Sequence, residues 1–230
     1  MTPRVTVVMP ARNEAQSLPL LLADLAPLRA AGAELILVDG GSTDATCEIA
    51  HGQVDRVITA PAGRARQMNA GAAQATGEYL WFVHADTRVD AAALAAFSRA
   101  LDAQPLWGRF DVRLSGPGPA LRLIGLMISL RSRLTGVASG DQGIFVKRQA
   151  FEAMGGYADI PLMEDLELSR RLKRQQRPSC LRCPLLTSSR RWERNGVWRT
   201  VLLMWRLRLA YYCGASPHRL ASQYHRGPPL

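Results

Sequence analysis

The stretch YLWFVHADTRV, residues 79–89, sets a buried strand directly against polar residues. Its apolar run, Leu80–Val83, is long enough for a strand covered on both faces, which is typical of parallel α/β sheets. The run stops abruptly at His84, Ala85 and Asp86. Because ligands of open α/β sheets bind at the carboxyl ends of the strands, Asp86 is predicted to belong to a site.

Strands and helices alternate through the chain before this stretch. The hydrophobic pattern predicts strands at residues 5–9, 33–40, 55–60 and 80–83, with helices at about 18–31, 43–51 and 64–75. This alternation predicts a parallel sheet with right-handed crossovers, so the loops that follow the strands meet at one edge. These loops read PARNE (10–14), DGGSTD (39–44), PAGRAR (61–66) and HADTR (84–88).

The second half of the chain has a mixed pattern. A helix at 90–103 is followed by expected strands at 107–116 and 143–148 and by an amphipathic helix at about 120–134. The fold class is therefore α/β, with a mostly parallel central sheet flanked by helices. We expect one domain over residues 1–190, with halves at about 1–116 and 117–190, and a basic amphipathic helical tail over 191–230.

Composition limits the function classes. The 230 residues are 47% hydrophobic, which is enough for a packed core, and the formal net charge of +10 favours an anionic partner. Nucleic acid, phosphorylated small molecules and an acidic membrane surface all satisfy this condition. The N-terminal stretch lacks the apolar core of a signal peptide, and arginines interrupt the longest apolar segments. These features predict a cytoplasmic protein.

The loops offer groups that could bind a nucleotide. Asp39 could accept hydrogen bonds from ribose hydroxyls or from a uracil N3–H, or it could cap the following helix. Arg64 stands at an expected helix start near Gln67 and Asn69, where guanidinium and backbone N–H groups favour a phosphate. A solvated basic helix end is the alternative. Dinucleotide binding would need G-x-G-x-x-G after the first strand, where the sequence reads PARNEAQS.

Carboxylates supply the chemistry expected at the site. Asp86 could hold Mg²⁺ or Mn²⁺ through one oxygen while a diphosphate and water complete the shell. His84 could ligate the metal, orient Asp86, or form a hydrogen bond within its loop. Glu164 and Asp165 begin a helix after an apolar loop, which could hold a base in a low-dielectric setting. Alternatively, the pair only complements the helix dipole.

With these loops the chain resembles the family 2 glycosyltransferases of the GT-A fold. The resemblance runs from about Val5 to Trp192 and depends on four stretches in order, PARNE, VDGGSTD, HAD and ED (164–165). GRARQMNAGA (63–72) and GDQGIFVKR (140–148) are similar to a small bacterial subgroup. The resemblance implies a GT-A nucleotide-diphospho-sugar transferase fold, with a donor-binding first half and an acceptor-binding second half.

The resemblance also implies roles for individual residues. Asp165, with Glu164 beside it, would be the general base of an inverting transfer from a UDP-linked sugar, and Asp86 with His84 would hold the metal. The acceptor or the donor sugar would contact Gly140, Asp141 and Gln142. The donor would be surrounded by Pro10, Ala11, Arg12, Glu14, Asp39, Gly41, Arg64, Gln67, Asn69, Ala85 and Asp86.

Two departures from the family pattern matter. The D-x-D motif reads His84-Ala85-Asp86 here, which removes one carboxylate and leaves the choice between Mg²⁺ and Mn²⁺ open. The Q-x-x-R-W motif of processive synthases would need Gln at position 188, where the sequence has Ser188 before Arg191-Trp192. Transfer of a single sugar is therefore predicted.

The tail combines aromatic residues such as Trp198 and Trp205 with arginines, which fits a helix lying on anionic lipid at the inner face of the cytoplasmic membrane. An ordinary packed helix is the alternative. A membrane position would suit a lipid, a polyprenyl phosphate, or a carotenoid-like alcohol or acid as acceptor.

Two rival functions stay open. A nucleotide-sugar-binding protein with little or no transferase activity is consistent with His84. Nucleic-acid binding agrees with the net charge, but Asp39, Asp86, Glu164 and Asp165 at the strand ends would repel phosphates, so no nucleic acid is expected as a partner.

Overall fold

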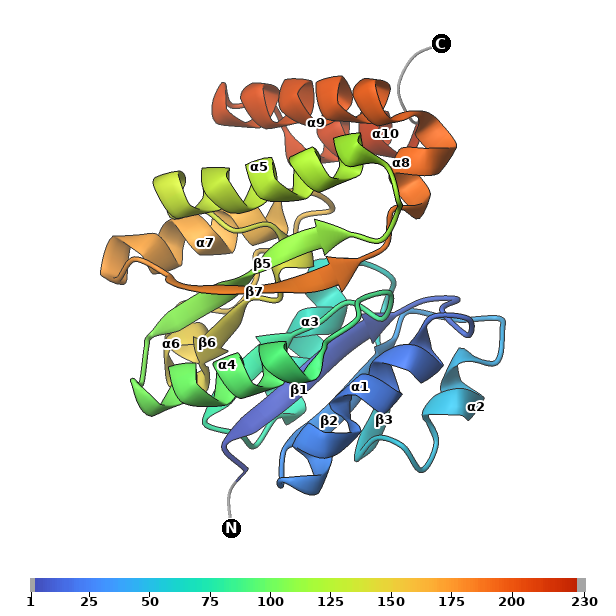
Figure 1. The fold of residues 1–230 in the computed structure, drawn as a ribbon, viewed down its shortest axis with the longest axis vertical. Coiled ribbons are helices and arrows are strands. Elements are labelled where there is room, and N and C mark those ends of the chain that lie inside the picture. The colour runs from blue at the N-terminus through green and yellow to red at the C-terminus, as the bar shows by residue number, and fades with distance from the viewer. Residues whose placement is uncertain (1–2, 227–230) are drawn as a thin grey trace.

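The computed structural model describes residues 3–226 as one seven-stranded sheet covered by helices (Figure 1). The strands are β1 (Val5–Ala11), β2 (Glu34–Asp39), β3 (Arg56–Thr59), β4 (Tyr79–Phe82), β5 (Trp107–Leu114), β6 (Phe145–Lys147) and β7 (Ser179–Thr187). The helices are α1 (Leu18–Ala30), α2 (Thr46–Ala50), α3 (Arg64–Gln74), α4 (Ala91–Asp102), α5 (Pro119–Thr135), α6 (Arg148–Ala153), α7 (Glu164–Gln175), α8 (Arg190–Asn195), α9 (Val197–Tyr212) and α10 (Pro217–Arg226).

The order of the strands in the sheet is β3-β2-β1-β4-β6-β5-β7. The four strands of the first half are parallel, while β6 pairs antiparallel with both β4 and β5. The predicted α/β class with a mostly parallel sheet is confirmed. Because β1 to β4 point the same way, their following loops meet at one edge of the sheet.

Alternation of side chains along the strands produces two cores. Trp81 packs with Phe97 of α4 and with α1 residues on one face, whereas Phe82 packs with Phe151 of α6 and with α3 and α7 residues on the other. A third, smaller cluster joins α7 to α9 and α10 through residues such as Leu166 and Leu207. The last helices are therefore packed against the start of α7 and the loop before it.

Two regular elements were not expected from the sequence. Residues 179–187 form the edge strand β7, which is parallel to β5 and shifts register between Phe110 and Asp111. Cys180 and Cys183, which are spaced as a C-x-x-C pair, lie in this strand. All four cysteines of the chain are free. The second is α6 at residues 148–153, directly after β6, whereas α8 (190–195) begins the expected helical tail, and its Arg190 reaches the sheet edge where the loops meet.

Helix α3 approaches β1 and β2 closely because Gly71 has no side chain. A Cβ at this position would lie 2.4 Å from Val8 Cγ1 and 2.9 Å from Val38 Cγ2. This contact fixes the distance between α3 and the sheet. It thereby fixes the positions of Arg64 and Gln67 of α3 near the carboxyl edge of the sheet.

We expect Gly71→Ala to lower the free energy of unfolding by about 1–3 kcal/mol, because a methyl group must be forced into a packed core. Urea unfolding monitored by circular dichroism measures this change. Gly118→Ala is the matched control, since its Cβ would have no atom within 4 Å. Equal stability of the two variants would contradict the close approach of α3.

Candidate active site

A cavity of about 720 Å³ opens at the carboxyl edge of the sheet, within the size range of small-molecule sites. Thirteen of the predicted site residues line it: Pro10, Ala11, Arg12, Glu14, Arg64, Gln67, His84, Ala85, Asp86, Gly140, Asp141, Glu164 and Asp165. The strand-end loops and the start of α7 thus share one space. The cavity continues past them, between α5 and α9.

Gln67 joins the ends of the first two strands. Its buried Nε2 donates hydrogen bonds to Ala11 O at 2.9 Å and to Val38 O at 2.8 Å. Gly40 lies so close that a Cβ there would be 2.9 Å from the Gln67 amide nitrogen. The amide therefore holds the PARNE and DGGSTD loops in a fixed relation.

Four predicted site residues do not line the cavity, and their polar groups have local partners. Asp39 is buried and accepts hydrogen bonds from the backbone N–H groups of Gly41 and Ser42. Asn69 exchanges two hydrogen bonds with the backbone of Tyr157. Gln142 donates to Phe110 O and accepts from Ser139 N.

Desolvation raises the pKa of the Asp39 carboxyl, but the hydrogen bonds from Ser42 and Gly41 outweigh it, and the pKa is lowered overall. Asp39 is therefore ionised and holds the turn at Gly41, whose φ is +86°. In this geometry the carboxylate shapes the loop. Its predicted contact with the nucleoside stays a prediction.

Glu164 and Asp165 are the first two residues of α7 and line the cavity, directly after the apolar loop at residues 161–163. Asp165 Oδ2 accepts a hydrogen bond from Gly140 N at 2.6 Å, and Oδ1 accepts one from Leu166 N at 2.7 Å. Burial raises the pKa of Glu164, and Asp165 beside it raises it further. Burial also raises the pKa of Asp165, against the lowering effect of its two backbone hydrogen bonds. Such a carboxylate is suited to proton transfer.

His84 lies between the strand end and this carboxylate pair. A Cβ on Gly140 would be 2.9 Å from His84 Nε2 and 3.7 Å from Asp165 Oδ2, so the imidazole tip is directed at the loop that Asp165 anchors. Desolvation, followed by the charge of Arg64, lowers the pKa of His84 to about 3. The imidazole is therefore neutral at physiological pH.

Arginines surround the carboxylates. Arg64 is exposed over much of its side chain, but its guanidinium lies toward Glu164, Asp165 and Asp86. Desolvation lowers the pKa of Arg64, and the neighbouring negative groups reverse this and raise it overall. The side chain therefore stays charged where a phosphate could approach.

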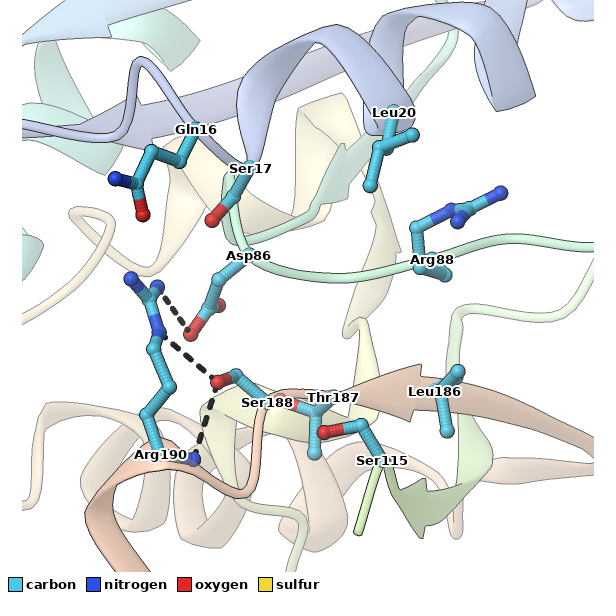
Figure 2. A pocket seen from close by; sticks show the side chains of 10 residues that line it. All are labelled: Gln16, Ser17, Leu20, Asp86, Arg88, Ser115, Leu186, Thr187, Ser188 and Arg190. Atoms are coloured by element: carbon cyan, nitrogen blue, oxygen red, sulfur yellow. Dashed lines mark hydrogen bonds and ion pairs between the residues drawn. The ribbon is translucent and has the colours of Figure 1, made fainter. Parts of the chain in front are cut away.

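Arg190 of α8 was not predicted as a site residue, yet it reaches Asp86. Figure 2 shows its guanidinium directed at Asp86 and Ser188. Arg190 Nη2 lies 3.5 Å from Asp86 Oδ2, and Arg190 Nε donates a hydrogen bond to Ser188 Oγ at 3.0 Å. Arg190 also forms an ion pair with Glu14 Oε2 at 2.9 Å. In the SSRRW stretch (188–192) the sequence signal is the missing glutamine at position 188, and no motif identifies Arg190.

The donor set fits a cation that arrives with a diphosphate. Within residues 3–226 no three His, Cys, Asp or Glu side chains are grouped to hold a metal ion. Asp86 presents a partly exposed carboxylate to the cavity, and Mg²⁺ at phosphate sites commonly uses only one or two carboxylates. One protein carboxylate with substrate oxygens and water therefore suffices.

A model of the glycosyl transferase family 2 matches residues 6–150, more than half of the chain. The chain therefore belongs to this family, in agreement with the resemblance seen in its motifs.

Three uncharacterized glycosyltransferases from Mycobacterium bovis and two strains of Mycobacterium tuberculosis are each 35% identical over 99 residues. The match covers 43% of this chain and 44% of each relative, so the chain spans less than half of the length of these curated relatives.

Solved structures confirm the GT-A fold. Residues 1–349 of S. aureus TarS, in complex with UDP, superpose with a TM-score of 0.65 at 17% identity, covering 80% of this chain and 60% of that fragment. The mannosyltransferase PcManGT of Pyrobaculum calidifontis, in complex with GDP-Man and Mn²⁺, gives 0.59 at 20% identity, covering 96% and 68%. Glucosyl-3-phosphoglycerate synthase of M. tuberculosis, in complex with Mn²⁺, UDP and its product, gives 0.57 at 20% identity, covering 80% and 71%.

Proposed function

We propose that this glycosyltransferase moves a single sugar from a UDP-linked donor to a hydroxyl or carboxyl acceptor with inversion at the anomeric carbon. The observation behind the proposal is the shared cavity, which joins the strand-end loops to the buried Glu164–Asp165 pair. Structural neighbours that hold UDP or GDP-Man support a nucleotide-sugar donor. The donor would lie along the loops from β1 and β4, with its sugar toward Asp165.

Asp165 is the general base in this proposal, which its buried position in the cavity supports. In the proposed step it takes the proton of the acceptor hydroxyl while the acceptor oxygen forms a bond to the anomeric carbon. The bond from that carbon to the diphosphate oxygen breaks, and its electron pair leaves with the diphosphate. Attack opposite the leaving group inverts the configuration. A carboxyl acceptor is already ionised at neutral pH and would not need the base.

Asp86 would hold a divalent cation, and Mn²⁺ in two structural neighbours is consistent with this proposal. Such a cation neutralises charge on a departing diphosphate. Arg64 and Arg190 supply fixed positive charge on either side of this position. His84 is neutral and two residues away, so it is available as a further ligand.

We expect Asp86→Ala to abolish the part of UDP binding that depends on Mn²⁺, weakening affinity about tenfold or more, because a charge-assisted contact is lost. Calorimetric titration of UDP with and without Mn²⁺ measures this loss. Asp102→Ala removes an exposed carboxylate of α4 and serves as the control. Mn²⁺-dependent binding that survives in Asp86→Ala would contradict the assignment.

Asp165→Asn should reduce turnover by roughly 10²–10⁴ while leaving UDP affinity near that of the wild type, because only the base is lost. Release of UDP from UDP-sugars, with water as acceptor, provides a rate without a known acceptor. The acid limb of the wild-type pH profile should lie above the ordinary carboxyl range, since the pKa of Asp165 is raised and the base must be deprotonated.

Asp159→Asn, which alters an exposed carboxylate before α7, is the control for turnover. Undiminished donor hydrolysis in Asp165→Asn would rule out the base. Tight UDP binding without any hydrolysis by the wild type would instead favour a nucleotide-sugar-binding protein that does not transfer.

The acceptor proposal includes a lipid or polyprenoid and peripheral attachment to a membrane. Helices α5 and α9 have large exposed apolar side chains that do not line the cavity: Leu126, Leu130, Leu134, Leu202, Leu209 and Tyr212. No helix among the described residues is long and apolar enough to cross a bilayer. Attachment would therefore depend on these surfaces and on nearby arginines.

We expect the protein to co-float with vesicles containing anionic lipid and to dissociate as salt screens the arginines. The double variant Leu126→Ser with Leu202→Ser should float less, because these side chains are 63% and 69% exposed and do not line the cavity. Leu20→Ser on α1 is the control. Wild-type protein that stays with the soluble fraction would contradict membrane attachment.

A further inference from the structure

The cavity has a second part that the donor does not account for. Beyond the carboxylate pair it runs between α5 and α9, which lie on the same side of the sheet (Figure 1). Apolar side chains from the two helices form its walls: Leu123, Ile124, Met127, Ile128, Val201 and Met204. This part is an open apolar groove that begins next to the proposed base.

Two arginines meet where the groove joins the carboxylates. Arg131 comes from α5 and Arg208 from α9, and both line the cavity. Burial and, after it, the charge of Arg208 lower the pKa of Arg131 to about 10, while Asp141 and Asp165 act in the opposite direction. The two positive charges therefore share one cavity wall and repel each other.

The hydrogen-bond donors of this pair are incompletely satisfied. Nε and Nη2 of Arg131 and Nε of Arg208 are buried and have no hydrogen-bond partner among residues 3–226. No described carboxylate lies within ion-pair distance of either side chain, although exposed arginines such as Arg4 and Arg66 form such pairs. Buried donors without partners are costly, especially on charged groups.

An oxyanion would relieve both the repulsion and the missing hydrogen bonds. Guanidinium groups bind phosphate and carboxylate through paired N–H donors, and two of them facing one site favour such a group over a neutral hydroxyl. The donor diphosphate has its own arginines, Arg64 and Arg190, near Asp86. The Arg131–Arg208 pair is thus left for a different ligand group.

We propose that Arg131 and Arg208 bind a phosphate or carboxylate group of the acceptor, whose apolar body occupies the groove between α5 and α9. The acceptor is then an anionic amphiphile, anchored beside Asp165 so that its reacting oxygen faces the donor sugar. This inference rests on the proposed glycosyl transfer, because it assigns the groove to the acceptor of that reaction.

Quenching of tryptophan fluorescence provides a direct test, since Trp198 and Trp205 line the cavity. Decyl phosphate below its micelle concentration, decanol and inorganic phosphate are titrated into the wild type in the presence of UDP and Mn²⁺. Decyl phosphate should bind about tenfold or more tightly than decanol, as expected for charge-assisted hydrogen bonds. It should also bind more tightly than inorganic phosphate, because only the alkyl chain fills the groove.

Arg131→Gln and Arg208→Gln should each remove most of the preference for decyl phosphate over decanol while UDP affinity is unchanged. Arg122→Gln on α5 and Arg206→Gln on α9 remove the same charge from exposed positions outside the cavity and should keep the preference. Unchanged melting temperature and UDP binding show that each variant is folded.

Equal binding of decyl phosphate and decanol by the wild type would overturn the proposal, as would loss of UDP binding in Arg131→Gln, which would assign the pair to the donor. Binding to anionic vesicles without binding of monomeric decyl phosphate would also overturn it and make the groove a membrane surface. Failure of the wild type to bind UDP is a separate result, which would contradict the donor site and not the anion preference.

Discussion

The geometry of the site depends on two hydrogen bonds that the Gln67 side chain donates. One buried amide nitrogen ties Ala11 O at the end of β1 to Val38 O near the end of β2. Ala11 O also accepts a hydrogen bond from Gly40 N at 2.9 Å, so the amide strengthens a junction that the backbone already makes. Because the amide belongs to α3, the packing of α3 at Gly71 and the positions of the two strand-end loops are one constraint.

The first half of the fold could be predicted because each of its elements has a local signal. Strands β1, β2 and β4 are continuous apolar runs, and the helices between them have an apolar stripe. Strand β7 lacks such a signal because Arg182 and Pro184 interrupt it. Proline is tolerated on an edge strand, and the shift in register near Asp111 accommodates the irregular segment. Its place beside β5 is set by pairing with residues 71–73 positions earlier in the chain.

The presence or absence of a local sequence signal also separates the site residues that could be predicted from those that could not. Asp86, Glu164 and Asp165 stand at the ends of recognisable elements, so a loop position and a residue type were enough to select them. Arg131 and Arg208 lie within amphipathic helices, where an arginine is common and usually faces solvent. Their meeting depends on how α5 and α9 pack against each other. Asn69 shows the converse, since a polar residue near a site motif has a structural partner in Tyr157.

The charge of the cavity shows why the net charge of the chain does not by itself locate a binding site. Its described wall contains five arginines and five carboxylates: Arg12, Arg64, Arg131, Arg191, Arg208, Glu14, Asp86, Asp141, Glu164 and Asp165. Arg190 adds one positive charge at the rim. The excess of +10 therefore lies almost entirely on other surfaces. A diphosphate that binds in this cavity would give the cavity an excess of negative charge.

Two changes could remove this excess of negative charge from the cavity. Protonation of the Glu164–Asp165 pair is favoured by its burial, but a protonated Asp165 could not accept the acceptor proton. A cation that enters with the diphosphate would neutralise the charge at Asp86 and would leave the proposed base, Asp165, ionised. The charge balance of the wall therefore supports a divalent cation even though only one carboxylate remains of the D-x-D pattern, because the need for positive charge comes from the whole cavity.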